Sequence, residues 1–102
     1  MTLPVIILSA AESDIRKAVT YFDEVRPGHG ELFRLEVDWA IGMIRRWPHS
    51  HEKISPQLRR FVLRRFPYSL VYRPLRSHIR VVGVVATRRD PDIIAAMDAY
   101  RS

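Results

Sequence analysis

A run of basic residues dominates the middle of this 102-residue sequence. Between Arg45 and Asp90 there are twelve arginines and lysines against two acids, Glu52 and Asp90. Guanidinium groups bind phosphate or carboxylate through two parallel hydrogen bonds and stack on aromatic rings. The residues interleaved with these cations are aromatic and aliphatic: Phe61, Val62, Leu63, Phe66, Tyr68, Leu70, Val71 and Tyr72. The pattern predicts a basic, aromatic-laced sheet surface whose partner is an anion.

The charge is distributed unevenly along the chain. Residues 1–44 carry four basic and seven acidic side chains, so the net charge of +6 comes from the second half. Arginine outnumbers lysine fifteen to two, which suits a recognition surface or reflects codon usage. Clustered cations favour three partner classes: nucleic acid, an anionic ribonucleoprotein or an acidic protein segment.

The composition is that of a single globular domain, residues 1–102, with 47% hydrophobic and 27% charged residues. There is no cysteine, which excludes disulfides and thiolate metal sites and favours a reducing cytoplasm. The apolar start, Met1 to Leu8, is short and lacks the basic n-region of a signal peptide. It is therefore expected to form a first strand. No apolar run approaches the roughly 20 residues that a membrane span needs, so no membrane partner is expected.

Two helices are expected in the first half of the chain. Val5 to Leu8 has the composition of a strand covered on both faces. Ser9 to Glu12 matches a capping box, and the helix it begins should end near Arg26, before Pro27 and Gly28. A second amphipathic helix should follow and end before Pro48, antiparallel to the first because the connection is short. Residues 48–58 are expected to form a polar loop.

Three strands and a last helix are expected in the second half. The apolar period becomes two over Leu58–Phe66, Tyr68–Arg73 and Ile79–Thr87, which predicts an antiparallel meander. Asp90 as cap and Pro91 at the first position predict a short C-terminal helix. The fold class is α+β: an N-terminal strand, an antiparallel two-helix hairpin packed on an antiparallel β-meander, and a short C-terminal helix.

Several ordered segments together resemble the RelE/ParE superfamily of bacterial toxins, of the plasmid-stabilisation type and the ParE-like branch. They are Arg26-Pro27-Gly28-His29-Gly30, Trp47-Pro48, Leu58-Arg59-Arg60-Phe61, the run from Arg65 to Arg73, and Arg88-Arg89-Asp90-Pro91. The resemblance implies a toxin of a type II toxin-antitoxin pair. Its partner would be a cognate antitoxin encoded beside it, of the ribbon-helix-helix type with an acidic C-terminal arm.

Two toxic activities occur on this fold, inhibition of DNA gyrase and ribosome-dependent cleavage of messenger RNA. A metal-independent endoribonuclease would use Arg60, Arg65 and Arg88 as phosphate-binding cations with Tyr68 nearby. The chain departs from the nuclease branch at Val62, Ser69 and Ile94. It also has Thr87 close to the point where many plasmid-stabilisation relatives have a histidine. The resemblance therefore favours a gyrase inhibitor without a catalytic centre of its own. The nuclease and a degenerate, non-toxic family member remain as alternatives.

Binding residues can also be proposed. Target binding is placed on Arg88 and Arg89 with the C-terminal helix, because these residues join dense positive charge to an adaptable element. Antitoxin binding is placed on the helical hairpin and on the sheet: Phe22, Leu32, Leu35 and Trp39, with Arg59, Arg64, Arg73 and Arg80.

Purely structural roles compete with these assignments. Tyr68 and Tyr72 would pack on the helical hairpin, and Arg73 and Arg80 would be surface residues or cross-strand partners. Trp39 and Trp47 would be core and hairpin-edge residues. His49, His51 and Glu52 could suggest zinc, but no second pair of ligands stands at usable spacing. Neither a metal nor a cofactor is expected.

Overall fold

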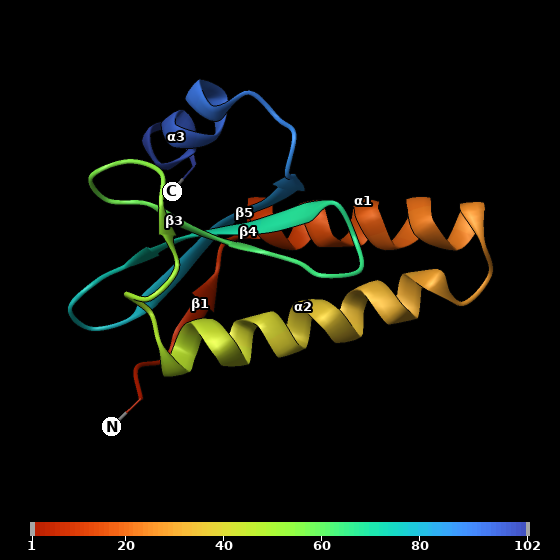
Figure 1. Ribbon diagram of the computed structural model, residues 1–102, viewed down its shortest axis with the longest axis horizontal. Coiled ribbons are helices and arrows are strands. Elements are labelled where there is room, and N and C mark those ends of the chain that lie inside the picture. The colour runs from red at the N-terminus through yellow and green to blue at the C-terminus, as the bar shows by residue number, and fades with distance from the viewer. Residues whose placement is uncertain (1, 102) are drawn as a thin grey trace.

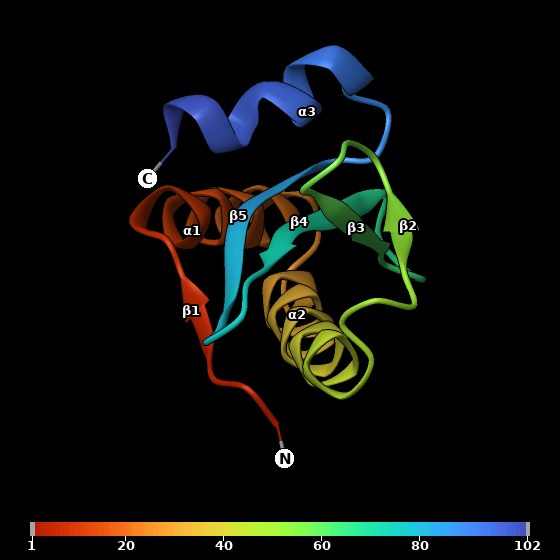
Figure 2. The same ribbon diagram turned by 90° about the vertical axis from the view of Figure 1, so that its left-hand side faces the viewer.

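Two long helices cover one face of a five-stranded sheet and a third helix covers the other, in a computed structural model that describes residues 2–101 (Figures 1 and 2). The helices are α1 (Ser9–Val25), α2 (His29–Arg46) and α3 (Pro91–Tyr100). The strands are β1 (Val5–Ile7), β2 (Glu52–Lys53), β3 (Arg59–Val62), β4 (Tyr68–Pro74) and β5 (Ile79–Ala86). This is the predicted fold class.

The strand order across the sheet is β1-β5-β4-β3-β2. Strands β3, β4 and β5 form the predicted antiparallel meander, and β1 lies parallel to β5 at the edge. Strand β3 is shorter than the predicted Leu58–Phe66, and the loop predicted over residues 48–58 contains β2. Between Val71 and Tyr72 the register of β4 against β5 shifts, which marks an irregularity in the centre of the sheet.

Two expectations for the start of the chain are wrong. Strand β1 is not covered on both faces, because Ile6 is 48% exposed at the sheet edge. No capping box forms at Ser9: Leu8 is the N-cap residue, and no side chain caps the helix. The reason is strand pairing, since the Leu8 N–H still donates to the Val81 carbonyl at 3.1 Å and Ser9 is already helical.

The turn between α1 and α2 depends on two glycines and one acid. Gly28 has a φ of +91°, a left-handed conformation that glycine adopts without strain. The Asp23 carboxylate accepts N–H bonds from Gly28 at 3.0 Å and Gly30 at 3.2 Å. A side chain at position 30 would lie 2.6 Å from the Val19 carbonyl, so Gly30 allows the two helices to approach closely. The hairpin is antiparallel and tight, as predicted.

The sheet separates two apolar clusters. The larger lies between the sheet and the α1–α2 pair, and the smaller lies between the sheet and α3. Fully buried members of the larger cluster include Phe33, Val37, Ile44, Leu70 and Tyr72. Those of the smaller cluster are Leu58, Val71, Val82, Val85, Ile94 and Met97. Both faces of the central strands are therefore covered.

Helix α3 begins as predicted and packs closely. The Asp90 carboxylate accepts the Asp92 N–H at 2.9 Å, with Pro91 at the first position. A side chain at Gly83 would lie 2.7 Å from the Met97 Cε atom, so the glycine lets α3 approach β5. Arg101 then donates to both Asp14 oxygens, at 2.6 and 3.3 Å, and ties the end of α3 to α1. Among residues 2–101 no helix has the length and apolarity needed to span a bilayer.

Candidate functional site

Basic residues line hollows at two opposite ends of the sheet and do not form a single platform. Figure 1 shows the turns that mark these two ends. One end, called the β3–β4 end, holds the β3–β4 turn at residues 63–67 beside the α1–α2 turn. The other, called the β4–β5 end, holds the β2–β3 loop at residues 54–58 and the β4–β5 turn at residues 75–78. The two ends differ in what surrounds their cations.

At the β3–β4 end, α2 presents an exposed apolar stripe. Leu32, Leu35 and Trp39 are 40%, 54% and 38% exposed, so Trp39 does not lie in the core. Together with Glu36, Arg64 and Arg65 they line a hollow of about 280 Å³, called the α2 groove. Large apolar side chains that remain exposed together and are bordered by polar groups are typical of interaction sites.

Three contacts hold the groove in shape. The Glu36 carboxylate accepts the backbone N–H groups of Arg64 and Arg65, the latter at 3.2 Å, and so ties the β3–β4 turn to α2. The Arg64 guanidinium lies 4.7 Å from the centre of the Trp39 ring. The ring in turn packs edge-on against Phe61, with centroids 5.5 Å apart. The groove therefore has an apolar floor and a cationic rim before any partner arrives.

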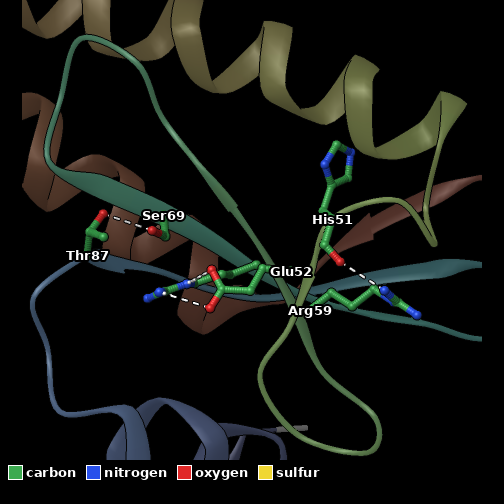
Figure 3. Close-up of polar contacts among 6 residues, drawn as sticks. His51, Glu52, Arg59, Ser69 and Thr87 are labelled. Atoms are coloured by element: carbon green, nitrogen blue, oxygen red, sulfur yellow. Dashed lines mark hydrogen bonds and ion pairs between the residues drawn. The ribbon is translucent and has the colours of Figure 1, made fainter.

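A second hollow adjoins the groove and contains Arg88. It measures about 420 Å³ and is also lined by Arg64, Arg65 and Thr87. The loop after β5 is held there because the Thr87 N–H donates to the Pro67 carbonyl at 2.9 Å. The hydroxyl oxygens of Ser69 and Thr87 lie 2.8 Å apart (Figure 3). Arg89 lines a neighbouring hollow of about 370 Å³, between α1 and the end of β5.

The structure separates the residues predicted for RNA cleavage. Arg65 and Arg88 share one hollow, as a phosphate-binding pair would. Arg60, however, is paired with Glu52 at 2.9 and 3.2 Å, and it lines a different hollow beside α3. Tyr68 packs on the other side of the sheet, with its ring 5.4 Å from that of Phe33. The four side chains do not converge on one point.

The four departing positions have structural roles or are exposed. Ser69 and Thr87 bond to each other, Ile94 of α3 is buried against the sheet, and Val62 is exposed. No acid-base group takes their place in the Arg88 hollow, whose lining holds no acid and no histidine among the described residues.

Tyr72 packs in the apolar cluster beneath the helical hairpin, as predicted. Its side chain is fully buried, and its hydroxyl donates to the Pro48 carbonyl at 2.7 Å. Desolvation by burial raises the pKa of Tyr72 from 10.0 to about 12, against a lowering effect of Arg59. The phenol therefore keeps its proton near neutral pH, where its hydroxyl is occupied by the bond to Pro48.

The eight residues predicted for antitoxin binding fall into two groups. Leu32, Leu35, Trp39 and Arg64 line the α2 groove, and Phe22 lies part-buried against Phe66 and Tyr68 at the same end. The other group belongs to the sheet. Arg73 and Arg80 are cross-strand partners, as the structural alternative predicted, and both face Asp98 of α3, at 2.8 and 4.0 Å. Arg59 donates to the His51 carbonyl at 2.8 Å (Figure 3).

The histidines of the loop after α2 do not meet around a common point. The His51 ring packs edge-on against Phe61, with centroids 4.8 Å apart, whereas His49 is exposed. Within residues 2–101, no three histidine, aspartate or glutamate side chains stand close enough together to hold a metal ion.

Sequence reasoning missed four residues that shape these surfaces. Glu36 and Asp98 are the carboxylates that organise the β3–β4 turn and the Arg73–Arg80 pair. Lys53 and Arg76 belong to a basic hollow at the β4–β5 end. Helical periodicity could have put Glu36 on the face of α2 next to Trp39, but no local signal links Asp98 to β4 or Lys53 to Arg76.

The comparisons with known proteins bear on the fold. No family model and no curated protein sequence matches this chain. Among solved structures, the chain is similar to one described as the chromosomal ParDE TA system from P. aeruginosa. The TM-score is 0.74 at 14% sequence identity, and the match covers 82% of this chain and 95% of the other. The chain therefore has a ParE-like fold, as its sequence motifs indicated.

Proposed function

We propose that this chain is the toxin of a type II toxin-antitoxin pair of the plasmid-stabilisation type and that it acts in the bacterial cytoplasm. The fold supports the proposal, because its solved neighbour belongs to a ParDE TA system. The observation that carries it furthest is the α2 groove, where an exposed apolar stripe lies beneath the Arg64 side chain. A protein that keeps such a stripe exposed has a partner for it.

The partner proposed for the α2 groove is the acidic C-terminal arm of a ribbon-helix-helix antitoxin. An amphipathic segment would place apolar side chains on Leu32, Leu35 and Trp39, and its acids would meet Arg64 and Arg65. Phe22 would support the groove from the aromatic cluster behind it. Arg59, Arg73 and Arg80 could join only if the arm extends around the sheet to the β4–β5 end.

The proposed target is DNA gyrase, bound through Arg88 and Arg89. These arginines stand on the exposed loop between β5 and α3, and neither forms an ion pair with any described residue. Inhibition by binding needs no proton-transfer groups, whereas RNA cleavage needs a base and an acid beside the phosphate. The separation of Arg60 and Tyr68 from the Arg65–Arg88 pair thus favours gyrase inhibition over the ribosome-dependent nuclease.

The test is to induce the chain alone in a bacterium and to follow growth, DNA supercoiling, the SOS response and messenger RNA ends. We expect growth arrest with DNA breaks and intact messages. The double variant Arg88→Ala with Arg89→Ala should lower toxicity at least tenfold. The control Arg16→Ala with Arg34→Ala removes the same charge from exposed positions on the helices and should remain toxic. Truncated messages would establish the nuclease instead, and normal growth at full expression would establish a degenerate member.

A further inference from the structure

The β4–β5 end contains a basic hollow that is separate from the α2 groove and from the Arg88–Arg89 loop. It measures about 410 Å³ and lies between the β2–β3 loop and the β4–β5 turn, on the opposite side of the molecule from the α1–α2 turn (Figure 1). Its cationic lining comes from three segments: Lys53 from β2, Arg59 from β3, and Arg73 and Arg76 from β4 and the following turn. We call it the β4–β5 hollow.

Hydrogen bonds to neighbouring residues orient Arg59 of β3 and Arg73 of β4. Arg59 Nη1 donates to the His51 carbonyl at 2.8 Å, and Arg73 Nη1 donates to Asp98 Oδ2 at 2.8 Å. A guanidinium has five N–H donors, so each arginine keeps donors for a ligand. A side chain that is oriented beforehand loses less conformational freedom on binding. These two arginines therefore form a preorganised pair of donors.

The charge of the hollow is not neutralised by its own lining. No aspartate or glutamate is among the described residues that line it. Lys53 and Arg76 are exposed and form no ion pair with any residue in the range 2–101. The one acid close behind, Asp98, is shared between Arg73 and Arg80. The hollow thus concentrates positive charge in a concave site, where the local potential is strongest.

We propose that the β4–β5 hollow binds the phosphate of a nucleotide or of a single nucleic-acid strand. Phosphate offers more acceptor oxygens than a carboxylate and can therefore satisfy several cations converging from different strands. The rest of the wall includes Pro56, Pro74 and Leu75, which give the sugar or base an apolar surface. The lining has no exposed apolar stripe like that of the α2 groove, so a protein segment would find little to anchor it. The assignment is independent of the toxin function.

The experiment uses the purified chain and four probes: inorganic phosphate, thymidine 5′-monophosphate, an oligothymidylate of about ten nucleotides and an oligoglutamate peptide. Affinities would be measured at several salt concentrations. Backbone amide shifts would be mapped by NMR, and we expect the phosphate-bearing probes to shift the amides of Gln57 and Leu75. Binding of the mononucleotide would identify a small ligand, and binding of the oligonucleotide alone would identify a nucleic-acid strand. Either result supports the proposal.

The variant Lys53→Ala with Arg76→Ala should lower the affinity for the probe about tenfold. For the oligonucleotide, the slope of the logarithm of affinity against the logarithm of salt concentration should fall by about 1.4 in magnitude, because two phosphate contacts are lost. The control Arg16→Ala with Arg34→Ala removes equal charge elsewhere and should change affinity much less. The pair Lys53→Arg with Arg76→Lys keeps the charge and should keep binding. Equal losses in the first two pairs, preference for oligoglutamate, or no shifts at Gln57 and Leu75 would overturn the assignment.

Discussion

Trp39, within α2, and Trp47, the C-cap residue of α2, each lie beneath an arginine, yet the two surfaces around them differ in kind. Arg64 lies 4.7 Å from the centre of the Trp39 ring at the β3–β4 end, and Arg46 lies 4.9 Å from that of Trp47 at the β4–β5 end. The rings are 38% and 46% exposed. Trp39, however, continues into the stripe of Leu32 and Leu35, whereas the hollow at the other end is lined by cations.

The comparison shows that arginine by itself does not specify a partner. A guanidinium beside apolar side chains suits an amphipathic protein segment, whose hydrophobic residues supply affinity and whose acids supply orientation. A guanidinium among other cations, in a hollow without carboxylates, suits phosphate. The fold therefore places the arginines of one basic sequence in two different surroundings, one apolar and one cationic.

The largest expected effect concerns stability at the β4–β5 end at high pH. The pKa of Tyr72 is raised to about 12 by burial, so the unfolded chain loses this proton more readily than the folded one. The pKa shift adds about 2–3 kcal/mol to the free energy of unfolding below pH 10, and this contribution is lost as pH rises through 12.

The measurement is urea unfolding of the wild type and of Tyr72→Phe from pH 8 to pH 12. The variant should lose about 1 kcal/mol at neutral pH, because the Pro48 carbonyl loses its donor. Its free energy of unfolding should then fall less with rising pH than that of the wild type. Parallel curves for the two proteins would show that Tyr72 does not retain its proton and that burial at this end is weaker than the structure indicates.

The next effect uses the matched tryptophans to test the β3–β4 end. Trp39→Ala should weaken antitoxin binding by about 2 kcal/mol, roughly thirtyfold, as is usual when a central aromatic anchor is truncated. Trp47→Ala removes an equally large ring under an arginine at the opposite end and should leave the affinity unchanged. Calorimetric titration with the antitoxin encoded in the neighbouring reading frame would compare them. Equal losses for both variants would place the antitoxin along the whole of α2.

The smallest effect tests the link between α3 and the sheet. Asp98→Ala would leave Arg73 and Arg80 opposite each other across β4 and β5 without their carboxylate. Like charges in direct cross-strand contact repel, so we expect a loss of about 1–2 kcal/mol in the free energy of unfolding. Asp38→Ala, an exposed acid on α2, is the matched control and should have almost no effect. An equally small effect of both would mean that Asp98 contributes no more than a surface charge.

Local signals predicted most of the elements. Asp90 and Pro91 began α3 as expected, and Pro27 with Gly28 ended α1, because caps and helix breakers act within a few residues. The capping box at Ser9 failed because pairing of Leu8 with Val81 decided where the helix begins. Of the candidate sites, the Leu32, Leu35 and Trp39 stripe could be identified in advance. The β4–β5 hollow could not, because Lys53, Arg59 and Arg76 meet only through β2, β3 and the turn after β4.

The order of the elements, the excess of positive charge after Arg45 and the resemblance to a toxin family can all be read from the chain before folding. These properties follow from composition and short-range spacing. Only the tertiary structure decided which cations lie together, which carboxylates hold them and which face each arginine occupies. The physical reason is that strand register and the placement of α3 over the sheet join residues far apart in the chain, such as Arg73 with Asp98 and Asp14 with Arg101.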